Sequence, residues 1–153
     1  MPRKILVAVD LSRMGEQVVD YGLSLGGRLD VSVSFMHVLP HPYLFKGYEP
    51  WIPRKDIDQE ISEVARKRLL YYLKKAEGKN PSLEHVERDV HILEGNPGDV
   101  IIRFAREHQY NLIVTGYRGH SAIERLVVGS TASTIARYAH CSVLIYRPGS
   151  ELP

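Results

Sequence analysis

Five short apolar runs, separated by segments with helical patterns, constrain the fold of this chain most strongly. The first run, residues 5–9, is continuous and rich in branched side chains, which is typical of a strand buried on both faces of a parallel sheet. Similar runs recur at 31–38, 90–93, 112–114 and 142–146. Strands that alternate with helices predict an α/β fold, with right-handed crossovers and helices on both faces of a parallel sheet.

Two of the intervening segments carry clear helix patterns. Residues 56–77 repeat apolar side chains at spacings of three and four, so they predict one long helix. A polar loop is expected to follow at 78–84. Ser12 is the expected N-cap of an earlier helix, and Gly26 and Gly27 are expected to end it because glycine readily adopts the left-handed conformation of a C-cap.

Two shorter helices are predicted in the second half of the chain. Asn96 is an expected N-cap, Pro97 suits the first helical position, and Asp99 places an acid in the first turn. Residues 131–138 predict the last helix, with Ile135 and Ala136 buried. The complete order is therefore βαβαβαβαβ.

Residues 41–53 interrupt this pattern with four aromatic residues, three prolines and a glycine. The prolines exclude a regular helix or a central strand, so we expect a compact surface loop. Its aromatic side chains could stack over a bound base, pack on the rim of the sheet, or form a surface for a partner protein.

Composition narrows the class of protein. The length of 153 residues suits a single domain spanning 1–153. Twenty basic residues against eighteen acidic ones give a net charge of +2, which argues against a dedicated nucleic-acid or membrane-surface binder. No apolar run reaches the roughly 18 residues of a membrane helix. The chain enters a strand without a signal-peptide pattern, so a cytoplasmic location is expected.

A glycine pattern follows the fourth strand. Gly116 and Gly119 are followed, after nine further residues, by Gly129 and Ser130. The second half of the pattern enters the last predicted helix, whose first amides and positive dipole end suit a phosphate group. Glycine lets the backbone approach such a ligand, and the hydroxyls of Ser130 and Thr131 add donors.

Other residues at the same place support a nucleotide site. In a parallel sheet, ligands bind beyond the carboxyl ends of the strands where the strand order switches. Asp10, Val38 and Thr115 stand at three such ends, and Arg118 and His120 lie inside the glycine pattern. The alternative is that these glycines serve only turns and caps in a fold without a ligand.

The sequence resembles the universal stress protein family, specifically its ATP-binding branch. The resemblance runs from about Lys4 to Tyr146 and rests on the opening run that ends at Asp10, the strand end at His37 and Val38, the Gly-Asn-Pro-Gly-Asp segment at 95–99, and the glycine pattern. It implies a doubly wound, Rossmann-like sheet of the adenine nucleotide alpha hydrolase type, with strand order 3-2-1-4-5.

The resemblance also implies a ligand and its contacts. The expected ligand is ATP, with ADP, AMP or a cyclic nucleotide also open, accompanied by Mg²⁺ or Mn²⁺ that the phosphates chiefly hold. No metal-ligating side chain is assigned. Together with the residue pattern, the resemblance gives the residues expected around the nucleotide: Ala8, Val9, Asp10, His37, Val38, Thr115, Gly116, Arg118, Gly119, His120, Gly129, Ser130 and Thr131.

The family resemblance and the last strand together predict a homodimer. Ser142, Val143, Leu144 and Ile145 form a short strand without charge, and an unprotected edge strand invites pairing with a second copy. We expect a regulatory module whose nucleotide occupancy, with slow hydrolysis an option, changes its interactions with client proteins in a stress response. A slow ATPase or other nucleotide-processing enzyme, and a dimeric scaffold that needs no nucleotide, remain as alternatives.

Overall fold

The computed structural model describes residues 2–39, 54–117 and 128–149. In chain order, its elements are β1 (Lys4–Ala8), α1 (Arg13–Leu29), β2 (Ser32–Leu39), α2 (Arg54–Lys79), the 3₁₀ helix η2 (Pro81–His85), β3 (Arg88–Glu94), α3 (Pro97–Glu107), β4 (Leu112–Gly116), α4 (Ser130–Tyr138) and β5 (Ser142–Tyr146).

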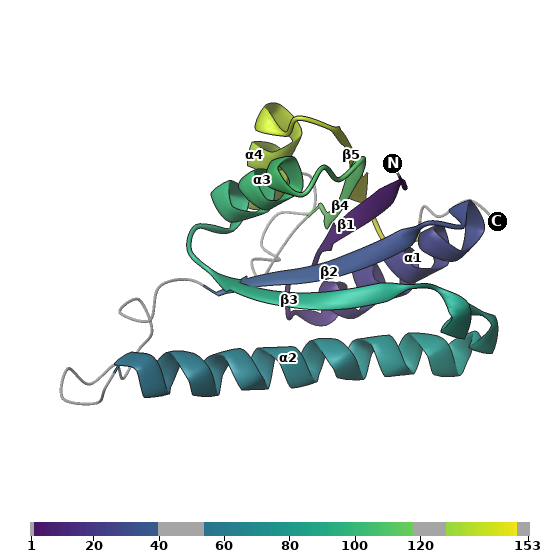
Figure 1. Ribbon diagram of the computed structural model, residues 1–153, viewed down its shortest axis with the longest axis horizontal. Helices are drawn as coiled ribbons and strands as arrows, with labels where there is room; N and C mark the ends of the chain where they lie inside the picture. The colour runs from purple at the N-terminus through teal and green to yellow at the C-terminus, as the bar shows by residue number, and fades with distance from the viewer. Residues whose placement is uncertain (1, 40–53, 118–127, 150–153) are drawn as a thin grey trace.

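The strands form one parallel sheet in the order β3-β2-β1-β4-β5 (Figure 1). This confirms the predicted fold and strand order. β1 lies at the centre, and β3 and β5 are the two edges. The chain builds the sheet outward from β1 in one direction, then returns to its other side through β4, so the strand order switches between β1 and β4.

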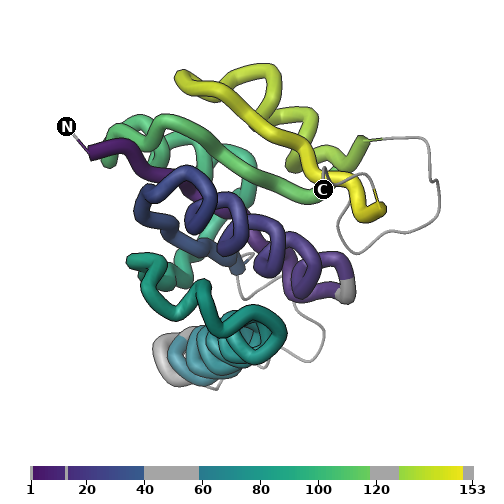
Figure 2. The backbone as a smooth tube through the Cα atoms, turned by 90° about the vertical axis from the view of Figure 1, so that its right-hand side faces the viewer, coloured from purple at the N-terminus to yellow at the C-terminus, as the bar shows by residue number. Residues whose placement is uncertain are grey.

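Helices cover both faces of the sheet, as expected for a doubly wound fold. Figure 1 shows α1 and α2 on one side and α3 and α4 on the other, and Figure 2 shows the same layers after a quarter turn. Alternate residues of β1 serve the two layers. Val7 packs in the core beneath α1 and α2 with Phe35 and Leu23, whereas Leu6 packs in the core beneath α3 and α4.

The predicted end of the first helix was wrong. α1 continues through Gly26 and Gly27 to Leu29, and Asp30 takes the left-handed conformation at φ 54° and ψ 52°. The two glycines instead allow close packing. A Cβ on Gly26 would lie 2.3 Å from Cγ2 of Val33, and one on Gly27 would lie 2.9 Å from Cδ2 of Leu83.

Other predicted boundaries also move. α2 extends beyond the expected 56–77, and the predicted loop at 78–84 contains the end of α2 and most of η2. The third strand is longer than expected, at Arg88–Glu94. In α4, Ile135 is buried as predicted, but Ala136 is exposed because it lies on the side of the helix away from the sheet.

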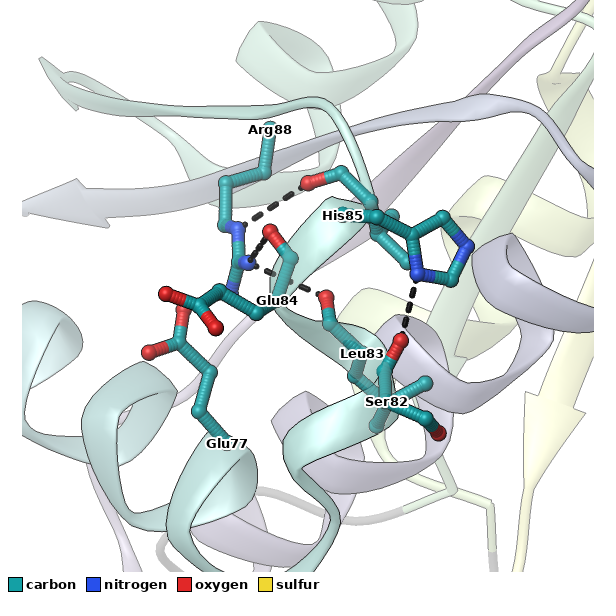
Figure 3. A network of polar contacts seen from close by, with 7 residues as sticks. Glu77, Ser82, Leu83, Glu84, His85 and Arg88 are labelled. Atoms are coloured by element: carbon teal, nitrogen blue, oxygen red, sulfur yellow. Dashed lines mark hydrogen bonds and ion pairs between the residues drawn. The ribbon is translucent and has the colours of Figure 1, made fainter.

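Arg88 joins the end of α2 to the start of β3 (Figure 3). Its Nη2 donates to the carbonyls of Leu83 and Glu84, both at 3.1 Å, and its Nε donates to the carbonyl of Val86 at 3.2 Å. The guanidinium also forms an ion pair with Glu77 of α2. One largely buried cation therefore satisfies the carbonyls of the connection and fixes the edge strand against α2.

Candidate nucleotide site

The carboxyl ends of the three central strands form the candidate site. Ala8 of β1 is in register with Met36 of β2 and with Thr115 of β4. Val38 and Gly116, which stand in the last two residues of β2 and β4, and Asp10, which follows β1, therefore lie at the same edge of the sheet. This is also the edge at which the order switches between β1 and β4, where ligands of such sheets bind.

His37 ties the ends of β1 and β2 together. The N–H of Val9 donates to the carbonyl of Met36 at 2.8 Å, and Nδ1 of His37 donates to the carbonyl of Val9 at 2.7 Å. The side chains of Val9 and Val38 are buried in the two opposite cores. Their packing fixes the backbone of both strand ends.

Asp10 shapes the turn from β1 into α1. Its Oδ1 accepts the N–H of Ser12 at 2.6 Å. Ser12 occupies the predicted N-cap position, but its hydroxyl makes no cap hydrogen bond. A Cβ on Gly15 would lie 1.6 Å from the carbonyl oxygen of Asp10, so the first turn of α1 can pack on this turn only because residue 15 is glycine.

Tyr72 supports the same turn from α2. Its hydroxyl lies 3.5 Å from the carbonyl of Leu11 and 3.4 Å from that of Ser12. The loop after β1 is thus held by its own aspartate, by α1 and by a tyrosine from a helix far along the chain.

The two halves of the glycine pattern meet at the end of β4. The N–H of Gly129 donates to the carbonyl of Tyr117 at 2.6 Å, and the N–H of Tyr117 donates to the carbonyl of Tyr146 at 3.0 Å. Gly116 ends β4, and Gly129 is the N-cap of α4. The start of α4 is therefore fixed beside the carboxyl end of a central strand.

The start of α4 has the properties of an anion site. Its first turn contains no acidic residue, and its N-cap has no side-chain cap hydrogen bond. Helix geometry leaves the first amides without partners inside the helix, and the dipole makes this end positive. Ser130 is exposed and Thr131 is half-buried, so two hydroxyls stand at this end of the helix.

α3 holds α4 in place. Gly95, at φ 139°, turns the chain out of β3, and the Oδ1 of Asn96 caps α3 by accepting the N–H of Asp99 at 3.2 Å. A Cβ on Gly98 would lie 2.9 Å from Cγ2 of Thr134 in α4. The Gly-Asn-Pro-Gly-Asp segment therefore starts α3 and lets it approach α4 closely.

Most of the predicted site residues come together. The structure brings the ends of β1, β2 and β4 and the start of α4 to one edge of the sheet. Arg118, Gly119 and His120 lie outside the described residues, as does the aromatic segment 41–53. The described members are Ala8, Val9, Asp10, His37, Val38, Thr115, Gly116, Gly129, Ser130 and Thr131.

Four supporting residues were missed by the sequence analysis: Gly15, Tyr72, Tyr117 and Tyr146. Gly15 and Tyr72 act on a turn in which they do not lie, and no spacing in the sequence signals their contacts. Tyr117 stands inside the glycine pattern, where its backbone bonds both to β5 and to Gly129. Its position next to Gly116 was the one signal that could have identified it.

The remaining polar groups add no metal centre within the described ranges. Among residues 2–39, 54–117 and 128–149, no three His, Cys, Asp or Glu side chains lie together as a set that could hold a metal ion. Burial raises the pKa of Cys141, which keeps the thiol protonated and unreactive at neutral pH.

Among the residues that the structure describes, no helix has the length and apolar character needed to cross a membrane.

Known proteins resemble this chain over nearly all of its length. The family model for the universal stress protein family matches residues 1–147. Universal stress protein A homolog 1 of Coxiella burnetii is 32% identical over 143 residues, which cover 93% of this chain and 94% of the relative.

Solved structures share the fold. The universal stress protein from Archaeoglobus fulgidus in complex with dAMP has a TM-score of 0.65 at 24% identity, covering 95% of this chain and 98% of that one. A universal stress protein in complex with cAMP has a TM-score of 0.62 at 18% identity, covering 95% of this chain and 97% of that one.

Proposed function

The chain belongs to the universal stress protein family, and from that premise we propose that it is a regulatory module that binds an adenine nucleotide. The site is the carboxyl edge of the sheet, where β1, β2 and β4 end beside the start of α4. In this proposal residues 1–153 form a single nucleotide-binding domain.

The hydrogen bond from Gly129 to Tyr117 is the observation that carries the proposal. It joins the two halves of the glycine pattern at 2.6 Å and sets the positive end of α4 beside the switch point of the sheet. Gly129 has φ −61° and ψ 157°, which any residue adopts. Its conformation therefore does not explain the glycine, whereas a ligand that approaches its backbone would.

The adenosine end of the ligand is assigned to β1 and β2. The side chains of Val9 and Val38 are buried, and the N–H and carbonyl of Val9 already bond to the end of β2. We therefore assign the backbone of Val38 to the base, and Val9 to holding the strand end beside it. The carboxylate of Asp10, oriented by the N–H of Ser12, is assigned to the ribose or adenine side. Two structural neighbours were solved with dAMP and with cAMP, which supports an adenine nucleotide as the class of ligand.

We assign the phosphates to the start of α4, with ATP as the preferred nucleotide and Mg²⁺ or Mn²⁺ held chiefly by its phosphates. Ser130 and Thr131 would add hydroxyl donors to the first amides of the helix. Arg118, Gly119 and His120 are assigned to the same end from their place in the glycine pattern. A divalent ion would neutralise phosphate charge there.

The proposed assembly is a homodimer through β5. This strand is an edge of the sheet, and Ile145 is 37% exposed on it. Pairing of β5 with the same strand of a second copy would cover this edge. Nucleotide occupancy would then change which surface the cytoplasmic dimer presents to a client protein.

The first test is to denature the purified protein and identify any released nucleotide by chromatography and mass spectrometry. Calorimetry with Mg-ATP then compares the wild type with Gly129→Ala. A Cβ at this position blocks approach of phosphate to the backbone, so we expect affinity to fall about tenfold or more.

Gly78→Ala is the matched control, because nothing lies within 4 Å of a Cβ at that position, and we expect it to bind like the wild type. The unfolding free energy of Gly129→Ala should stay close to that of the wild type, since its backbone angles suit alanine. Unchanged ATP affinity in Gly129→Ala would refute the proposal.

A further inference from the structure

Arg147 lies over the aromatic ring of Tyr117. Its guanidinium carbon is 4.7 Å from the ring centroid, which is within the range of a cation–π contact. Arg147 directly follows β5, whereas Tyr117 directly follows β4. The contact therefore joins the ends of two neighbouring strands at the edge of the sheet that carries the candidate site.

Tyr117 connects this contact to the start of α4. Its N–H donates to the carbonyl of Tyr146 at 3.0 Å, and its carbonyl accepts the N–H of Gly129 at 2.6 Å. Its backbone thus sets the position of the N-cap of α4, while its ring is held by Arg147.

Tyr146, whose carbonyl accepts the N–H of Tyr117, is itself held in the core. Its side chain is buried, and its ring stacks on that of Tyr21 in α1, with centroids 4.6 Å apart and planes at 27°. The end of β5 is thereby fixed to α1. Tyr146, which is fixed in the core, therefore holds Tyr117 by a backbone hydrogen bond, and Tyr117 holds Gly129 by another.

We propose that Arg147 is a positioning residue for the phosphate end of the site. By holding the ring of Tyr117, it fixes the carbonyl that receives the N–H of Gly129, and so it orients the first amides of α4. Its effect on nucleotide binding rests on the proposed function, whereas its effect on Gly129 exists in the protein without a ligand.

The first experiment measures hydrogen exchange of the Gly129 amide by NMR in the free protein. Arg147→Met keeps most of the length of the side chain but removes its charge, so the amide should exchange faster. Arg147→Lys and Tyr117→Phe keep a cation and a ring, and both should exchange nearly as slowly as the wild type. Unchanged exchange in Arg147→Met would overturn the proposal.

The second experiment compares binding of Mg-ATP and adenosine. A surface cation–π contact predicts about two- to fivefold weaker ATP binding in Arg147→Met, with adenosine affinity unchanged because the ribose and base lie at β1 and β2. In a Tyr117→Leu background, Arg147→Met should have no further effect.

The outcomes separate this proposal from the proposed function. If Arg147→Met weakens ATP binding equally in both backgrounds, the cation acts on the phosphates themselves and the positioning role is overturned. If the wild type binds no adenine nucleotide, the proposed function fails, and the exchange of the Gly129 amide still decides the role of Arg147.

Discussion

Replacing Gly98 by alanine should destabilise this protein, although alanine normally favours a helix. Gly98 is buried in the first turn of α3. A Cβ added there would lie 2.9 Å from Cγ2 of Thr134 and 3.2 Å from its Cβ. Carbon atoms pack best at roughly 3.5–4.0 Å, so α3 and α4 would have to move apart.

Two opposing effects set the size of the change. Replacing glycine by alanine in a compatible helix contributes about 0.4–1 kcal/mol of stability. Overpacking a close contact costs about 1–3 kcal/mol, and the β-branched Thr134 has little freedom to rotate away. We therefore expect a net loss of about 1–2 kcal/mol in the free energy of unfolding.

Urea unfolding measures this difference. Gly78→Ala in α2 is the matched control, because a Cβ there meets nothing within 4 Å, and we expect it to gain about 0.4–1 kcal/mol. Thr134→Ala removes the nearer contact atom, so it should recover part of the loss in the Gly98→Ala background. If Gly98→Ala is stabilised as much as Gly78→Ala, the account of the α3–α4 contact is wrong.

Three further predictions concern Arg88, the ion pair between Glu16 and Lys75, and the exposed edge of β5. Arg88→Met should cost about 1–2 kcal/mol in urea unfolding, because two part-buried carbonyls and an exposed one lose a charged donor; an unchanged midpoint would contradict this. The pKa of Glu16 is lowered, chiefly by its hydrogen bond from Lys75. The ion pair of Glu16 with Lys75 therefore stabilises the fold above pH 4.5, and this stabilisation is lost as pH falls through the lower pKa of the folded state. Glu16→Gln should therefore lose less stability in acid than the wild type does. An identical pH profile of stability in the two proteins would show that this ion pair does not contribute. Ile145→Lys should convert the proposed dimer to a monomer in sedimentation experiments, whereas the exposed Leu29→Lys should stay dimeric; a persistent Ile145→Lys dimer would count against β5.

The sheet could be predicted because its signals are local. Each buried parallel strand is a short apolar run that is visible without knowledge of its neighbours. The boundaries of helices were less predictable where one residue type serves two purposes. Gly26 and Gly27 fit a C-cap, but the contacts of Gly26 with Val33 and of Gly27 with Leu83 explain them instead. A sequence does not distinguish a glycine that turns the chain from one that permits close packing.

The candidate site was predictable to a similar extent. The glycine pattern and the strand ends identified the residues that lie at the edge of the sheet, because their spacing follows from the βα units. The supporting residues were not predictable. Tyr72 reaches the loop after β1 from α2, and Arg147 reaches Tyr117 from the end of β5. Both contacts depend on the packing of segments that are distant in sequence.

The most direct test of the nucleotide site is an NMR titration of the protein with Mg-ATP, with backbone amides assigned. The account predicts that the largest shift changes occur at the ends of β1, β2 and β4 and at Gly129, Ser130 and Thr131, and that adenosine changes the strand ends but not the start of α4. Shift changes confined to the amino ends of the strands, or no shift changes at all, would contradict the account.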